Sequence, residues 1–312
     1  MSAAVTTSLE AAYQECRAIS KREAKNFYYA FRVLPRAKMD AMCAVYAFMR
    51  KADDISDDES QSIESRRDRM NAWLNEWRAA RTVDEPRDSV FHALNDTQSR
   101  FGISDALLED LVRGTCMDLE LGDGTGNAVD LGDGLQGYQT FEDLYRYCYL
   151  VASVVGLVCI RIFGYSDPDA ELMAEKTGAA FQITNILRDI KEDAERKRIY
   201  LPQEVLREFD VTNADILQLA GGRALKPNER AMLMGLSVQA WEYYESGRKL
   251  IPLIDPDSRA CLWVMIEIYS GLLAKIDERQ GDVFSQRVSV PTSQKIFALV
   301  RGAAMSMRAR GK

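Results

Sequence analysis

The sequence predicts an all-α protein. Apolar residues recur at helical spacing along nearly the whole chain, and no run of alternating β-branched residues indicates a strand. Prolines stand where a new apolar period begins, which is their preferred place at a helix start: Pro35, Pro168, Pro202, Pro227 and Pro291. Because 312 residues with a hydrophobic fraction of 47% can build one large core, we expect a single domain over residues 1–312.

In the first half of the chain, the periodicity predicts helices at residues 8–31, 36–56, 62–81, 87–99 and 104–121. The second of these begins after Pro35 and ends in a strongly acidic stretch. Its side chains that we expect to face the core are Met39, Met42, Cys43, Tyr46, Ala47 and Met49.

In the second half, helices are predicted at residues 141–163, 168–194, 202–208, 212–219, 226–250, 257–281 and 292–308. The first of these holds the longest apolar run, which starts at Leu150 and stops at Arg161. This run is shorter than the roughly 20 apolar residues of a membrane span. We therefore expect a buried helix there and no transmembrane segment.

Residues 121–140, "LGDGTGNAVDLGDGLQGYQT", depart from the helical pattern. Six glycines and a repeated LGDG predict a flexible surface loop. Its aspartates raise the question of calcium, but the spacing of an EF-hand loop with its terminal glutamate is missing. We expect a plain insertion at the surface.

Composition excludes several classes of protein. The formal charge of −7 argues against a nucleic-acid partner, because proteins of that class present a net basic surface to phosphates. Six cysteines without CxxC pairing predict reduced core thiols in a cytoplasmic protein and no zinc site. The single histidine, His92, leaves no histidine pair for catalysis or metal binding. The first 20 residues lack the pattern of a signal peptide.

The stretch "RKADDISDDE", residues 50–59, places five carboxylates within ten positions at the end of an apolar helix. Asp53 and Asp57 are four residues apart, as are Asp54 and Asp58, so each pair shares one helix face. Burying unpaired carboxylates is costly, and a divalent cation is one way to remove that cost. The alternative is a solvated acidic helix end.

A second acidic stretch, "FQITNILRDIKEDAERKRIYLP", occupies residues 181–202. Asn185, Asp189 and Asp193 repeat every four residues along one helix face, and Gln182 lies one turn before them. Oxygen ligands of this kind suit Mg²⁺. Cations accompany both stretches and, together with a metal, would suit a diphosphate: Arg50, Arg188, Lys191, Arg196, Lys197 and Arg198.

With these residues in view, the sequence resembles the squalene/phytoene synthase family, the head-to-head trans-prenyl synthases, over about residues 20–290. Four segments carry the resemblance: "KNFYYAFRVLP", "AVYAFMRKADDISDD", "YCYLVASVVGL" and "AFQITNILRDIKEDAERKRIYLP". The resemblance implies an isoprenoid synthase-type helical bundle around a central cavity, with the two acidic helices facing each other near its mouth.

The resemblance also implies roles for single residues. The Mg²⁺ ligands would be Asp53, Asp57, Asn185, Asp189 and Asp193, with Asp54 and Asp58 in outer positions. The residues near the substrate diphosphates would be Lys25, Asn26, Arg50, Gln182, Arg188, Tyr269 and Arg287. Phe27, Phe31, Tyr46 and Tyr147 would line the prenyl channel or stabilise the carbocation, although core packing explains these aromatic residues equally well. Two departures from the family pattern are Asn26, where a small hydroxyl residue is frequent, and Ser153, where glycine is common.

The activity that the resemblance implies is the Mg²⁺-dependent condensation of two farnesyl diphosphates to presqualene diphosphate. The segments "YSGLLAKIDERQGDVFSQRV" and "NFYYAF" favour this bacterial, hopanoid-type branch. Continuation to squalene, and with it the use of NADPH, stays open. The alternatives are a phytoene synthase of carotenoid biosynthesis acting on two geranylgeranyl diphosphates, a class I terpene cyclase, and a non-catalytic helical interaction protein.

The C-terminal segment "SQKIFALVRGAAMSMRARGK" mixes apolar side chains with five cations. This composition is compatible with an interfacial helix that makes peripheral contact with a membrane. An ordinary solvated terminal helix is the other interpretation.

Overall fold

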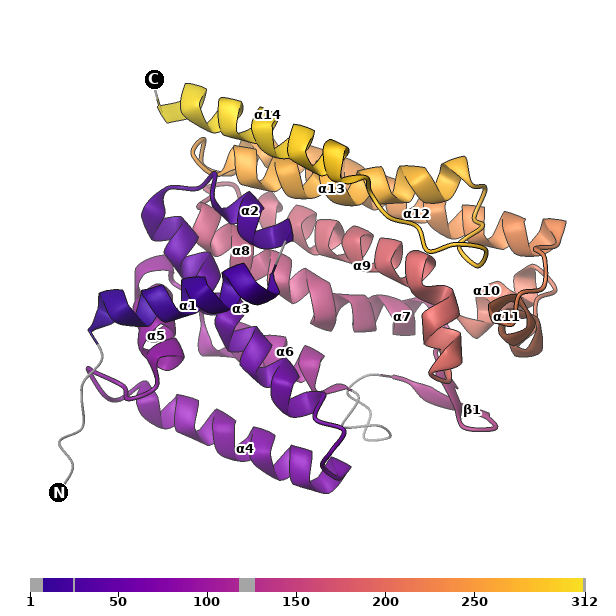
Figure 1. The fold of residues 1–312 in the computed structure, drawn as a ribbon, viewed down its shortest axis with the longest axis horizontal. Helices are drawn as coiled ribbons and strands as arrows, with labels where there is room; N and C mark the ends of the chain where they lie inside the picture. Colours follow the sequence, from indigo (N-terminus) through magenta and orange to yellow (C-terminus); the bar gives the residue numbers. More distant parts are fainter. Residues whose placement is uncertain (1–7, 25, 118–126, 311–312) are drawn as a thin grey trace.

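The computed structural model describes residues 8–24, 26–117 and 127–310, without the side chains of residues 26, 27 and 308–310. Helices dominate these ranges (Figure 1), as the sequence predicts. They are α1 (Leu9–Glu23), α2 (Asn26–Phe31), α3 (Arg36–Ser56), α4 (Ile63–Ala80), α5 (Ser89–Phe101), α6 (Asp105–Thr115), α7 (Phe141–Cys148), π-helix η2 (Tyr149–Ser153), α8 (Val154–Phe163), α9 (Asp169–Glu195), α10 (Gln203–Glu208), α11 (Asn213–Ala220), α12 (Pro227–Leu250), 3₁₀ helix η3 (Ile251–Leu253), α13 (Arg259–Glu278) and α14 (Thr292–Arg310).

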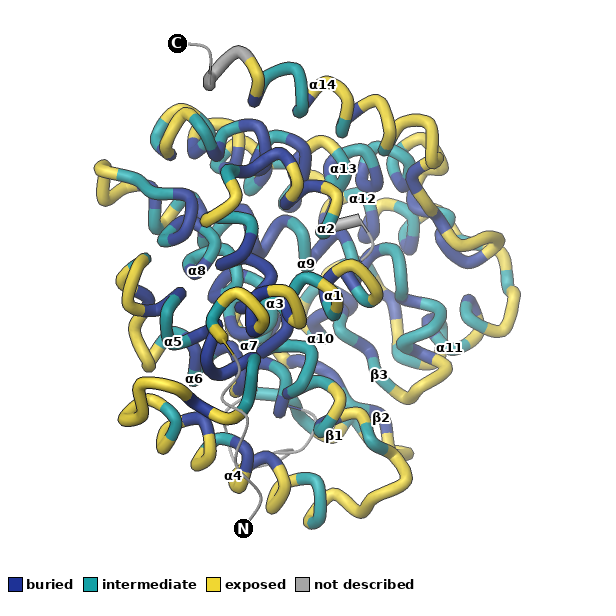
Figure 2. The backbone as a smooth tube through the Cα atoms, turned by 60° about the vertical axis from the view of Figure 1, so that its left-hand side comes forward, coloured by how far each residue is buried: buried dark blue, intermediate teal, exposed yellow. Residues whose placement is uncertain are grey.

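Helix α9 runs through the middle of the bundle (Figure 1). It packs against α7, α8, α11, α12 and α13, while α3 packs against α1, α4, α5, α6 and α8. On the outside, α14 lies over α13, and α4 lies along the opposite side of the molecule (Figure 1). The buried positions follow the inner faces of these helices (Figure 2). All six cysteines are free thiols and five of them are buried, in agreement with the sequence-based expectation.

Local chemistry explains where the helices begin. Pro35, Pro168 and Pro202 are the N-cap residues of α3, α9 and α10. Pro227 is the first residue of α12, and Pro291 directly precedes α14. Hydroxyl side chains cap free backbone N–H groups of α1, α4 and α6, and the carboxylate of Asp88 caps α5. Helices α7 and α11 each begin with a capping box, in which a threonine and an aspartate exchange hydrogen bonds with the backbone.

Two predicted helices are interrupted. The helix expected at residues 8–31 is split, because α1 ends at Glu23 and α2 begins at Asn26. The helix expected at residues 141–163 contains the five-residue π-helix Tyr149–Ser153 between α7 and α8. Apolar periodicity detects neither break, because the apolar faces continue across both.

The segment 121–140 is not the plain loop that its glycines predict. Residues 118–126 lie outside the described ranges, but Val129–Gly132 (β1) and Leu135–Gly137 (β2) form an antiparallel hairpin. Asp133 and Gly134 both have positive φ at its turn, as the Asp-Gly signature of a type I′ turn requires. Strand β2 also pairs in parallel with Arg198–Ile199 (β3), which directly follows α9. The small sheet therefore ties this segment to the end of the second acidic stretch.

The segment Phe141–Phe163 is, within the described ranges, the one long and apolar enough to cross a membrane by length and composition. In the structure it is the α7–η2–α8 unit, which packs on α3, α6 and α9. This placement agrees with the buried helix that the sequence predicts.

The π-helix lies very close to α9. A Cβ atom built on Gly178 of α9 would lie 2.6 Å from the carbonyl oxygen of Ala152 and 2.6 Å from the Cα of Ser153. Both contacts are with backbone atoms, which cannot rotate away. A glycine is therefore required here for α9 and the π-helix to pack at their observed separation.

We expect the substitution Gly178→Ala to lower the free energy of unfolding by about 1–3 kcal/mol, because the helices must move apart. Gly271→Ala is a matched control: Gly271 is also in a helix, but a Cβ built on it would meet nothing within 4 Å. This control should raise the free energy of unfolding by about 0.5–1 kcal/mol through helix propensity. Urea denaturation measures both, and equal effects of the two substitutions would contradict the close contact.

Candidate active site

An apolar cavity of about 290 Å³ lies between α3, the π-helix, α8, α9 and α13. Phe31 of α2 and Tyr46 of α3, two residues selected from the sequence, line it. The rest of the wall is mostly aliphatic and includes Val151 of the π-helix, Leu262 and Met265. A cavity of this composition suits a hydrocarbon and excludes water from it.

Polar groups of the cavity wall include three neighbouring side chains on α9 and α13. Gln182 and Asn185 contribute amides, and Tyr269 contributes a phenol. The Nδ2 atom of Asn185 donates a hydrogen bond to Oε1 of Gln182 over 3.4 Å. The Oδ1 atom of Asn185 is buried and accepts no hydrogen bond. Because buried acceptors are normally satisfied, this oxygen is suited to a ligand that the protein alone does not provide.

The first acidic stretch forms the last turns of α3 and the residues after it. Asp54 is engaged by Arg50 at 2.6 Å, and Asp58 by Arg69 of α4 at 2.5 Å. Asp53 and Asp57 have no ion-pair partner among the described residues. Burial, followed by the charge of Asp57, raises the pKa of Asp53 to about 6.

The second acidic stretch lies on the C-terminal half of α9. Asp189 is held by Arg188, and by Nη2 of Arg287 at 3.0 Å. Burial opposes ionisation of Asp189, but these two arginines outweigh it and lower its pKa below the ordinary value. Asp193, one turn further, has its pKa raised to about 7 by burial and by Asp189, against the smaller effects of Arg198 and Arg196.

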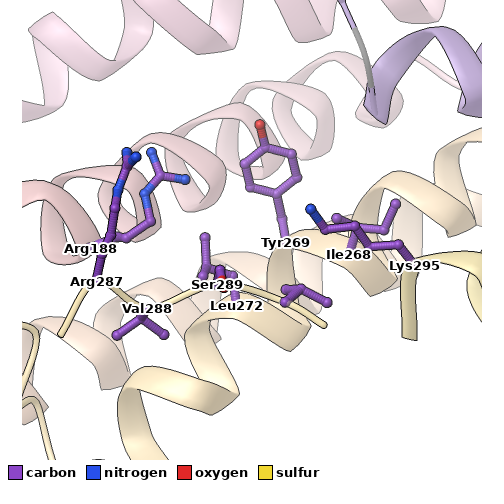
Figure 3. Close-up of a pocket in the computed structure, with 9 residues that line it drawn as sticks. Arg188, Ile268, Tyr269, Leu272, Arg287, Val288, Ser289 and Lys295 are labelled. Carbon is purple, nitrogen blue, oxygen red and sulfur yellow. The ribbon is translucent and has the colours of Figure 1, made fainter. Parts of the chain in front are cut away.

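A basic pocket of about 210 Å³ adjoins the cavity, and Tyr269 lines both. In Figure 3 the guanidinium groups of Arg188 and Arg287 lie on one side of Tyr269, and the amine of Lys295 lies on the other. Burial raises the pKa of Tyr269 to about 12, so the phenol stays protonated at neutral pH. Cations around a hydrogen-bond donor form a suitable site for a phosphate-bearing group.

Lys295 was not selected from the sequence. It is the fourth residue of α14 and has no ion-pair partner in the described part of the chain. A cation so close to a helix N-terminus is unfavourable for the helix dipole, and this was the signal available in the sequence.

Several other predicted site residues do not line the cavity or lie outside the described residues. Lys25 lies outside the described residues, as do the side chains of Asn26 and Phe27. Arg50 lies on α3 but is paired with Asp54 rather than lining the cavity. Tyr147 does not line the cavity either: its ring packs at 5.6 Å from Tyr138 and 5.0 Å from Tyr200.

In the ranges that the structure covers, no three His, Cys, Asp or Glu side chains lie close enough to hold a metal ion on their own. A metal would have to combine one carboxylate pair with other oxygen donors. That arrangement fits Mg²⁺, which typically takes one or two carboxylates together with water and substrate phosphates. The unsatisfied Oδ1 of Asn185 is one such donor on α9.

Comparisons with known proteins agree with this geometry. The family model described as squalene/phytoene synthase matches residues 20–294. The chain is 35% identical over 306 residues to the 15-cis-phytoene synthase of Synechococcus elongatus, covering 94% of this chain and 92% of that protein.

Two crystal structures share the fold. A dehydrosqualene synthase superposes with a TM-score of 0.78 at 27% identity, covering 96% of this chain and 98% of that one. A squalene synthase from Alicyclobacillus acidocaldarius superposes with a TM-score of 0.75 at 26% identity, covering 87% of this chain and 95% of that one. The chain therefore belongs to the squalene/phytoene synthase family and is a prenyltransferase of that type.

Proposed function

We propose that the protein condenses two geranylgeranyl diphosphates head to head, through a cyclopropyl diphosphate, to a C40 product. The observation that carries the proposal is the junction at Tyr269, where an apolar cavity meets a pocket with three cations. An allylic diphosphate has the same two parts, a hydrocarbon chain and an anionic diphosphate head. The 35% identity to a phytoene synthase supports the C20 substrate.

Magnesium is the metal that we propose for the two acidic stretches. The candidate ligands are Asp53 and Asp57 of the first stretch, with Asn185, Asp189 and Asp193 of the second. When bound, the metal would supply positive charge that offsets the charge of the departing diphosphate. The protein's own share of this task falls to Arg188, Arg287 and Lys295, whose pocket adjoins the cavity. Gln182 lies beside Asn185, where it can orient the amide.

The chemistry up to the cyclopropyl diphosphate, which keeps the second diphosphate, has two bond-forming events. The C–O bond of the first substrate breaks, its electron pair leaves with the diphosphate, and an allylic cation remains. The C2=C3 double bond of the second substrate attacks this cation, and loss of a proton closes the cyclopropane ring. The cavity wall, with Phe31 and Tyr46, protects the cation from water. Either the released diphosphate or a tyrosine accepts the proton.

A second candidate is condensation of two farnesyl diphosphates to presqualene diphosphate, the reaction that the sequence itself favoured. The fold similarity to a dehydrosqualene synthase and to a squalene synthase, at 27% and 26% identity, supports this shorter substrate. The higher identity to the phytoene synthase leads us to place the C20 substrate first. NADPH would be needed only for reductive continuation to squalene.

Product analysis decides between the two. The purified protein is incubated with Mg²⁺ and either geranylgeranyl or farnesyl diphosphate, each with and without NADPH, and the products are identified by mass spectrometry. We expect a C40 product from geranylgeranyl diphosphate that does not depend on NADPH. A C30 product alone would establish the second candidate, and a C15 or C20 hydrocarbon would contradict head-to-head condensation.

Removal of one cation from the basic pocket should weaken substrate binding. We expect Lys295→Gln to lower kcat/KM about tenfold or more, because a charge-assisted contact to phosphate is lost. Lys275→Gln is the control: Lys275 pairs with Glu278 on α13 and does not line the pocket. Steady-state kinetics measure both, and an unchanged kcat/KM for Lys295→Gln would exclude this pocket as the diphosphate site.

The carboxyls with raised pKa values should make the stability of the metal-free protein depend on pH. The pKa values of Asp53 and Asp193 are about 6 and about 7, against an ordinary 3.8, so the folded state holds these protons more tightly. Their contribution to stability is therefore present below about pH 4 and is lost as the pH rises through 6 and 7. Urea titrations should show that the free energy of unfolding falls more between about pH 5 and about pH 8 in the wild type than in Asp53→Asn/Asp193→Asn. In this variant the side chains at positions 53 and 193 stay neutral at both pH values.

The same pair of proteins tests the metal. At about pH 8, Mg²⁺ with inorganic diphosphate should raise the melting temperature of the wild type by ligand linkage and leave the double variant nearly unchanged. Mg²⁺ with sulfate in place of diphosphate is the control for ionic strength. An equal shift in both proteins would exclude these carboxylates as ligands.

A further inference from the structure

The outward face of α14 is apolar. Ile296, Phe297, Val300 and Met307 are 55%, 67%, 63% and 68% exposed. At about 100° per residue they span somewhat less than a third of the helix circumference, so they form one stripe, with three side chains in its first turns and Met307 two turns later. Figure 2 shows α14 at the edge of the molecule, where its exposed positions face away from the bundle. Scattered exposed apolar residues are ordinary, but a contiguous stripe of large ones indicates a binding surface.

The orientation of this stripe is fixed by close packing on the opposite face of α14. A Cβ built on Gly302 would lie 2.3 Å from Cγ2 of Val264, so α14 approaches α13 very closely. The hydroxyl of Ser306 donates to the carbonyl oxygen of Val33 over 2.7 Å. Rotating α14 to bury the stripe would break both contacts. The stripe is therefore available to something other than the described part of this chain.

Charge indicates what that partner is. The segment 292–312 contains five cations and no Asp or Glu, in a protein whose net charge is −7. Arg301 borders the stripe and lies 5.0 Å from the ring of Trp263, which holds its guanidinium at the edge of the helix. An apolar stripe bordered by Arg301, on a segment without acidic residues, matches a bilayer with anionic headgroups, in which the apolar side chains enter the acyl boundary and the guanidinium meets the phosphates.

One end of the stripe is close to the candidate active site along the chain. Lys295 lines the basic pocket from the inner side of α14, and the stripe begins at the next residue, Ile296, on the outer side. In the proposed function both the substrate tails and the product are hydrocarbons that water does not dissolve. Docking of α14 on a bilayer would bring the end of the helix that carries Lys295 close to the phase in which these molecules reside.

We propose that α14 is a membrane-docking helix, with the stripe Ile296, Phe297, Val300 and Met307 inserted at the surface of an anionic bilayer. The docking of α14 does not depend on the proposed function, but the idea that docking helps to exchange substrate and product with the bilayer does. This proposal selects the interfacial interpretation of the C-terminal segment over an ordinary solvated helix.

Vesicle flotation tests it with the full chain and no substrate. The wild type should float with vesicles of mixed phosphatidylcholine and phosphatidylglycerol, and about tenfold or more weakly with phosphatidylcholine alone. Ile296→Ser/Phe297→Ser/Val300→Ser should reduce partitioning by about a hundredfold, because three apolar side chains no longer enter the bilayer. A wild type that does not float, or a triple variant that floats equally well, would overturn the proposal.

Leu172→Ser/Val238→Ser is the matched control, because these side chains are 55% and 57% exposed but lie on α9 and α12. This variant should float like the wild type. Equal melting temperatures of all three proteins show that they are folded. If the stripe instead joins two copies of the chain, sedimentation without vesicles will show a wild-type dimer and a monomeric triple variant, and that result would also overturn the proposal.

Discussion

The close contact of α9 with the π-helix is the constraint on which the rest of the structure depends. At Gly178 the backbone of α9 comes within van der Waals contact of Ala152 and Ser153, and no side chain fits between them. This contact fixes the wall of the cavity, because Gly178 and Ala152 both line it. It also fixes the direction of α9, and thereby where Asn185 and the aspartates after it lie. One helix thus serves packing in its N-terminal half and chemistry in its C-terminal half.

The aspartates of the two acidic stretches differ in whether an arginine pairs with them. Arginines engage Asp54, Asp58 and Asp189, whereas Asp53 and Asp193 are partly buried without such compensation and have raised pKa values. Desolvation of an uncompensated carboxylate costs stability, so a fold selected only for stability would neutralise or expose these groups. Partly buried carboxyls without an arginine partner are therefore candidates for binding a ligand that carries positive charge, such as a metal ion. The sequence spacing alone could not make this distinction, because it depends on where Arg69 and Arg287 arrive in space.

The helices could be predicted because their signals are local. Apolar periodicity and prolines located α3 and α9 to within a residue or so, and the resemblance pointed to the family. The π-helix could not be found in this way, because residues 150–160 are apolar at nearly every position and present no separate face whose register could be seen to shift. The hairpin was missed although Asp133-Gly134 carried its turn signal, since the surrounding glycines resembled a loop. Lys295 was missed because its unfavourable place in the first turn of α14 does not reveal the approach of α14 to Arg188, on which its role depends.

The small sheet also determines the surroundings of Tyr147. Tyr138 follows β2 and Tyr200 follows β3, and both rings pack on Tyr147. The backbone N–H of Gln203 donates to the carbonyl oxygen of Tyr138 over 2.8 Å, which joins the strand to the start of α10. Tyr147 is therefore held in a group of three tyrosines, two residues before the π-helix begins. Because the π-helix carries Val151 and Ala152 of the cavity wall, we expect a substitution at Tyr147 to act on the cavity through the position of this helix.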